Sequence, residues 1–282
     1  AAPPEPATAG GVYGETWVYE SIVGALPGIE LSRPFAVGLQ LAVFEAGVLL
    51  LAWYYDLWTA AVAGTAAVLV AAVGSVEMLR IGSLARSAAV PESYRRLLFG
   101  SSIEVVLAVL AYVALVTHLF VFDPRSGTPL VETLFGPEPP VAVVYLTLLV
   151  LWDVCYRIGT GWWASVVALW RSARFRFDPG TVRTLRRADL ETMGFGLVQL
   201  LLVPFVLDHP VLLAALVGHV LAVATVTGTS LVLVGASMNR PLHQCRFPRR
   251  DTIRRRESTC RKPYSTRPPI REIARKTNHA PK

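Results

Sequence analysis

The sequence has little charge and an excess of apolar residues. Charged residues make up 17% of its 282 positions, whereas soluble domains average about 25%, and hydrophobic residues make up 53%. A disordered chain is excluded by this composition, because such chains have too few apolar residues to bury. An ordinary soluble enzyme is also disfavoured, since the apolar residues gather in several runs of near-membrane length.

Motifs of known chemistry are missing as well. The three cysteines, Cys155, Cys245 and Cys260, form no C-x-x-C pair and no Cys/His spacing typical of a metal site. The sequence contains no phosphate-binding loop, nucleophile elbow or H-E-x-x-H motif. We therefore expect no cofactor, no metal and no enzymatic activity; haem or metal held by histidines of different helices, and an intramembrane enzyme, are minor alternatives. A cleavable secretory signal is not expected either.

Lysine and asparagine are absent from residues 1–235 and present only in residues 236–282. The first part carries 13 Arg against 17 acidic residues, a net charge of −4, and the second part has a net charge of +11. Because the basic excess lies in the tail, we expect no nucleic-acid binding by the body. The tail, residues 235–282, is either a disordered polybasic segment that binds anionic lipid or nucleic acid, or the translation of a wrong reading frame, which we favour.

Six apolar runs are long enough to cross a bilayer, for which a helix needs about 20 residues. Helices are expected because backbone polar groups in lipid must be satisfied internally. The sequence therefore predicts an all-α, polytopic bundle over residues 35–234, preceded by an N-terminal segment, 1–34. The predicted spans cover residues 35–55, 57–79, 97–122, 141–163, 190–207 and 211–234.

The arginines predict how the spans are oriented. Eleven of the 13 Arg in residues 1–235 precede span one or lie between spans two and three or four and five, and only Arg125 lies in an opposite loop. By the positive-inside rule the Arg-rich face is cytoplasmic, so both termini are expected inside and the protein is expected to be a multi-pass protein of the cell membrane. Aromatic clusters within 53–58 and 162–170 mark the two interfaces.

Local signals refine this topology. Asp178 followed by Pro179 predicts a helix start ahead of span five, and Val90–Glu92 predicts one ahead of span three, so these helices should project beyond the membrane. The many small residues of span two predict a central, tightly packed helix. The run Gly159–Gly161 indicates a kink or a close helix contact. Two short segments are expected to be either interfacial helices or loops packed on the bundle, namely residues 15–26 and 128–135.

Polar residues inside the spans are candidate site residues, because charges in a bilayer are costly and usually face the bundle interior. The candidates for this polar core are Glu45, Glu104, Asp153, Arg157, Gln199 and His219. At a rise of about 1.5 Å per residue, Glu104 lies level with Arg157 and Glu45 level with Asp153. Asp153 and Arg157 share a helix face at i,i+4. Three acids against one arginine leave two uncompensated charges, so a protonated carboxyl, water or a cation is expected.

Two functions follow from these residues. The polar core binds or passes a small solute or ion, which is our best prediction; alternatively, the buried charges only fix helix packing in a membrane scaffold or accessory subunit. No internal repeat of the kind common in transporters is visible, which counts slightly against the first. The expected partners are the lipid bilayer and either other membrane proteins or further copies of the chain.

Three runs also carry a family resemblance: Tyr94–Glu104 (YRRLLFGSSIE), Leu151–Trp163 (LWDVCYRIGTGWW) and Pro204–Pro210 (PFVLDHP). Over roughly residues 12–234 the sequence resembles an uncharacterised family of multi-pass membrane proteins from halophilic archaea. The resemblance implies a membrane location and a helical topology. It implies no activity, ligand or catalytic residue.

Overall fold

The structure, a computed structural model, describes residue 17, residues 32–125, residue 127 and residues 129–236. Every regular element in these residues is a helix, as predicted. In chain order the elements are α2 (Arg33–Tyr55), α3 (Trp58–Ser87), α4 (Glu92–Phe99), α5 (Ile103–Thr117), the π-helix η1 (His118–Phe122), the 3-10 helix η2 (Asp123–Arg125), α6 (Leu130–Phe135), α7 (Val141–Arg174), α8 (Pro179–Val198), the 3-10 helix η3 (Gln199–Phe205) and α9 (Pro210–Ala236). The surface segment predicted over 15–26, apart from Trp17, and the tail from residue 237 onward lie outside the described residues.

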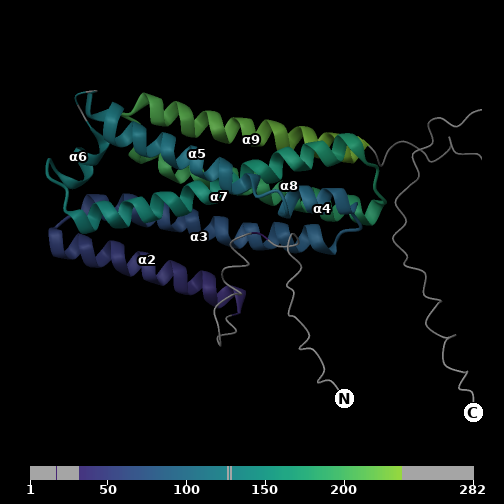
Figure 1. The fold of residues 1–282 in the computed structure, drawn as a ribbon, viewed down its shortest axis with the longest axis horizontal. Helices are drawn as coiled ribbons and strands as arrows, with labels where there is room; N and C mark the ends of the chain where they lie inside the picture. Colours follow the sequence, from purple (N-terminus) through teal and green to yellow (C-terminus); the bar gives the residue numbers. More distant parts are fainter. Residues whose placement is uncertain (1–16, 18–31, 126, 128, 237–282) are drawn as a thin grey trace, which may run out of the picture.

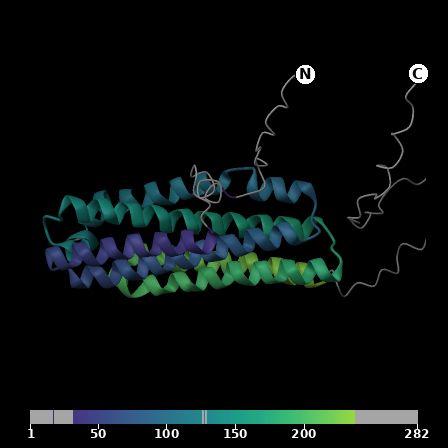
Figure 2. The same cartoon turned by 90° about the horizontal axis from the view of Figure 1, so that it is seen from below.

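The long helices run along one axis and form an elongated bundle (Figures 1 and 2). Six helical stretches are long and apolar enough to cross a membrane, in agreement with the six predicted spans. α3 packs against α2, α7 and α8, and α7 packs also against α5 and α9. We call the end with the α2–α3 turn and residues 123–140 the α6 end, and the end with residues 88–92 and 175–178 the α4 end (Figure 1).

Apolar side chains cover the outside of this bundle, and polar side chains lie within it. Leu50, Leu110 and Val232 are each more than 60% exposed. Ser165 and Thr227, by contrast, are completely buried, and their hydroxyl groups bond one another between α7 and α9 at 3.2 Å. A surface of this kind suits lipid rather than water, so the bundle fits an integral membrane protein.

The third predicted span, residues 97–122, lies within a membrane-length stretch as expected, but it is not one continuous helix. The chain leaves the helix between Phe99 and Ile103, where Ser102 adopts a left-handed conformation with φ 51°. The fifth span is also uneven, because α8 ends at Val198 and continues as a 3-10 helix that contains Pro204. Proline lacks the N–H that a regular helix needs, which accounts for the tighter turn.

Several local predictions are confirmed. α8 begins at Pro179, and the Asp178 carboxylate accepts the main-chain N–H groups of Gly180 at 3.0 Å and Thr181 at 3.2 Å. Hydrogen bonds from the Thr181 side chain and main chain lower the pKa of the Asp178 carboxyl below its ordinary value. The second surface segment is a helix, α6, which ends at Gly136 with φ 81°.

Close packing of α3 and α7 follows from their glycines. A Cβ at Gly74 would lie 2.7 Å from the Phe195 ring and 2.9 Å from the Arg157 Cβ. One at Gly159 would lie 2.8 Å from the Ala108 nitrogen of α5. Gly159 therefore allows α7 and α5 to approach backbone to backbone, and Gly74 leaves space for the side chains of Phe195 and Arg157 beside α3. These contacts confirm the central position of span two and the contact expected at 159–161.

Candidate functional site

Two of the six predicted polar-core residues, Asp153 and Arg157, lie together. Arg157 Nη2 donates to Asp153 Oδ1 at 2.9 Å, and the arginine side chain is completely buried while that of Asp153 is 15% exposed. Gln40 of α2, which the sequence did not single out, donates to Asp153 Oδ2 at 2.7 Å. Beside Asp153 lies a cavity of about 10 Å³, enough for one water molecule.

The two glutamates have different surroundings. Glu45 Oε1 accepts the Thr65 hydroxyl at 2.7 Å, which joins α2 to α3. Glu104 is completely buried, and neither of its carboxyl oxygens has a hydrogen-bond partner. The equal depth of Glu104 and Arg157 therefore does not give a hydrogen bond between them. Arg157 instead directs Nη1 toward the Met78 sulfur, at 3.8 Å.

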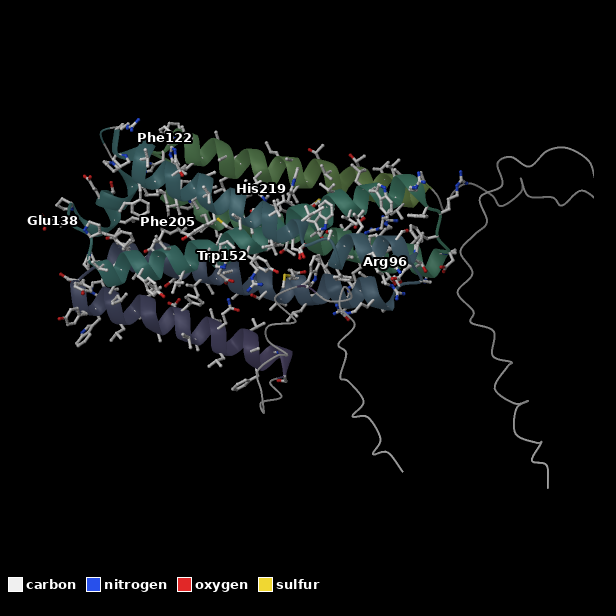
Figure 3. All side chains as sticks on the ribbon, viewed as in Figure 1. Arg96, Phe122, Glu138, Trp152, Phe205 and His219 are labelled. Atoms are coloured by element: carbon white, nitrogen blue, oxygen red, sulfur yellow. The ribbon has the colours of Figure 1, made fainter. Side chains whose placement is uncertain are left out.

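The last two predicted residues lie on the helices of the C-terminal half. Gln199 begins η3 and is 2% exposed, and its side-chain oxygen has no hydrogen-bond partner. His219 of α9 lies near the middle of the bundle (Figure 3), with its ring 6.1 Å from that of Trp162 between centroids. No group of three metal-binding side chains occurs among the residues that the structure describes.

A large apolar cavity was not predicted. Its volume is about 830 Å³, and it lies in the half of the bundle toward the α6 end. Phe122 and Phe205 line it toward that end and His219 nearer the middle (Figure 3). The other side chains of the wall come from α2, α3, α5, α6, α7, α9, η1 and η3, and almost all of them are Ala, Val, Leu or Ile. The polar or thiol side chains in the wall are Thr117, His118, Thr147, Cys155 and His219.

A buried ion pair toward the α4 end was also missed. Arg171 Nη2 donates to Asp189 Oδ1 at 2.6 Å, and both side chains are 2% exposed. Asp189 Oδ2 accepts the Ser230 hydroxyl at 2.9 Å, and Arg171 Nη1 donates to the Tyr94 hydroxyl at 3.1 Å. The network therefore joins α4, α7, α8 and α9. The sequence placed Arg171 between the fourth and fifth spans, because the apolar run ends before it, whereas α7 continues to Arg174.

A buried histidine–aspartate pair connects the loops at the α6 end. His209 Nδ1 lies 3.1 Å from Asp123 Oδ1, and both residues are buried. Asp123 Oδ2 accepts the main-chain N–H of Leu130 at 2.6 Å, at the start of α6. Asp123 thus connects η2, α6 and the beginning of α9. Leu130 itself lines the apolar cavity.

The N-terminal segment contributes one described residue, Trp17, to the core. This side chain is completely buried, and its Nε1 donates to the carbonyl of Met78 in α3 at 3.2 Å. The Phe99 ring meets it edge-on at a centroid distance of 4.9 Å. Gly82 provides the space for the Trp17 ring, because a Cβ at position 82 would lie 3.1 Å from the indole nitrogen. The sequence left open whether residues 15–26 form an interfacial helix or pack on the bundle, and it did not indicate that Trp17 would be the buried residue.

Comparison with known proteins identifies the family of this chain. Residues 12–230 match the family of unknown function DUF7530. The chain belongs to this family. No curated protein and no solved structure matches the chain. DUF7530 membership covers the whole described bundle except its last turns, so the apolar cavity and both ion pairs lie within the matched region.

Proposed function

We propose that this DUF7530 protein is a multi-pass membrane protein that binds one apolar or amphiphilic molecule of the membrane in the cavity near the α6 end. The observation that carries the proposal is a cavity of about 830 Å³ with an almost wholly apolar wall. Sites for small molecules typically measure about 300–1,000 Å³ and have a few polar groups among apolar ones. An ion or a polar solute would lose its hydration there without gaining enough partners.

The shape of the cavity supports a chain-like ligand. Its wall follows α7 from Val143 to Ile158, a rise of about 22 Å. Half of a hydrocarbon core of about 30 Å is about 15 Å, so the cavity extends over the depth of one leaflet. A hydrocarbon chain lying along the bilayer normal would meet apolar side chains over its whole length. The groups able to hydrogen-bond a polar substituent include His118, near one end, and His219, at the other.

Passage of an ion or small polar solute through the polar core is the second candidate. Asp153 supports it, because this partly exposed carboxylate adjoins a cavity of about 10 Å³. Arg157 and Gln40 already occupy both of its oxygens, however, and the space is large enough for only one water molecule. These contacts support a structural role for the pair, and the larger apolar cavity remains our proposed ligand site.

We infer further that the α4 end is cytoplasmic and that the protein resides in the cell membrane of a halophilic archaeon. Exposed Arg96, Arg176 and Arg183 lie at or near the α4 end, whereas Glu132 and Glu138 lie at the α6 end. The positive-inside rule then directs the cavity toward the outer leaflet. A body whose basic residues are all arginine supports the archaeal source.

The cavity proposal is tested by filling the cavity. Ala114 of α5 lines it, and its neighbour Val113, which is 54% exposed, does not. Ala114→Phe should reduce crosslinking to a phospholipid that carries a diazirine on its acyl chain at least fivefold, whereas Val113→Phe should leave it unchanged. Both variants should keep the thermal stability of the wild type.

The crosslinked peptides, identified by mass spectrometry, should come from α7 and α9 segments that line the cavity, such as those containing Cys155 and His219. Equal crosslinking in both variants, or crosslinks confined to exposed positions such as Leu110, would refute the proposal. The scaffold or accessory-subunit role would then be preferred.

A further inference from the structure

Glu104 occupies an unusual position, immediately after a break in a membrane span. α4 ends at Phe99, and α5 begins at Ile103 without a side-chain cap. The Leu97 carbonyl, near the end of α4, accepts the Ser101 hydroxyl at 2.8 Å and the Trp163 indole N–H at 3.0 Å. Interrupted helices in membranes are tolerated where the protein itself satisfies the freed backbone groups.

The carboxyl group of Glu104 differs from all others in the described part of the chain. It is the only carboxyl there whose two oxygens are both buried and without a hydrogen-bond partner. Glu45, Glu77 and Glu191 each have one such oxygen, but their other oxygen is in a hydrogen bond or an ion pair. A buried charge without a partner is strongly disfavoured, whereas a neutral acid is much less so.

The charged groups of the packed elements do not compensate Glu104. α5 packs mainly against α7 and η1. α7 supplies Asp153, Tyr156 and Arg157 near this level, and η1 supplies His118 at the opposite end of α5. Arg157, the one cation among them, is already neutralised by Asp153 at 2.9 Å. One arginine balances one acid, so the charge of Glu104 would be the uncompensated one.

We propose that Glu104 is a proton-binding site, held as a neutral carboxylic acid between α5 and α7 when the helices are packed as in this structure. The proposal does not depend on the ligand cavity. The buried acids outnumber the buried arginine, so at least one carboxyl group is expected to bind a proton, and Glu104 is that group. Release of the proton would need water at the carboxylate, and Glu104 is completely buried in this structure.

The break before Glu104 gives the deprotonated form a route to water. Glu104 lies in the first turn of α5, where the helix dipole favours a negative charge once the group is hydrated. Movement at residues 100–102 would admit water without unwinding either helix. Proton release is therefore expected to accompany opening of this segment, and proton binding its closure.

Infrared spectroscopy of the purified protein in lipid tests the proposal. At pH 7 the difference between wild type and Glu104→Gln should contain the C=O stretch of a protonated carboxylic acid, shifted by deuterium. The matched control is Glu132→Gln on α6, where the glutamate is exposed and its replacement should remove only carboxylate bands. Glu104→Asp should retain the band of a protonated carboxylic acid at a changed frequency. This variant tests the proposal even if the glutamine variant does not fold.

Loss of carboxylate bands alone in Glu104→Gln would overturn the proposal, because Glu104 would then be ionised. The same holds if Glu104→Asp leaves the acid bands of the wild type unchanged. If the proposal is correct, the protection factors of the amides at 100–104, which correct for the base-catalysed rise of intrinsic exchange, should also fall at alkaline pH in the wild type and not in Glu104→Gln.

Discussion

Replacement of Arg171 by leucine should strongly destabilise the bundle. The side chain of Asp189 is 2% exposed in the wild type. Without Arg171, the Ser230 hydroxyl would be its remaining side-chain hydrogen-bond donor. Removing one member of a buried ion pair typically costs about 3–5 kcal/mol, and little water can reach this site to reduce the loss. Joint replacement of Arg171 and Asp189 by leucine should recover more than half of it, because no buried charge then remains.

Arg157→Leu is the matched comparison. Asp153 is 15% exposed, keeps its hydrogen bond from Gln40 and adjoins space for one water molecule, so a smaller loss of about 1–3 kcal/mol is expected. The measurement is reversible unfolding by SDS in mixed micelles, followed by circular dichroism. An Arg171→Leu variant within about 1 kcal/mol of the wild type, or a double variant no more stable than the single one, would refute the reasoning.

Three further results are expected. In a background without Cys245 and Cys260, an impermeant maleimide applied to intact cells should label Glu138→Cys and not Arg176→Cys, both at exposed positions; the reverse pattern would exclude the proposed orientation. Trp17→Ala should lower the unfolding free energy by about 3–5 kcal/mol in the same SDS assay, since it empties a completely buried site, and an unchanged value would show that Trp17 does not dock. Asp178→Ala should lower it by about 0.5–2 kcal/mol through loss of the helix cap. Because folding lowers the pKa of this carboxyl, the difference from wild type should be complete above the ordinary value of 3.8 and shrink as pH falls below it; a difference that grows toward acid pH would contradict the assignment.

The sequence alone determined the features that depend on neighbouring residues. Apolar runs determined six spans, because the length needed to cross a bilayer is fixed by helix rise. Asp178 and Pro179 determined where α8 begins, because a cap acts within one turn. The pair Asp153–Arg157 could be anticipated for the same reason, since residues at i,i+4 meet on any helix.

Only the tertiary structure decided how each helix is rotated about its axis and which faces meet. Depth along the membrane can be counted from the sequence, but rotation cannot, so Glu104 was level with Arg157 without being bonded to it. Asp189 and Arg171 are separated by a turn and lie on different helices, so no local pattern predicted their contact. The apolar cavity depends on how the helices that line it pack, and its lining residues are apolar like those of a lipid-facing surface. Hydropathy therefore specifies that a residue avoids water, whereas packing alone specifies whether it meets lipid, another helix or an empty space.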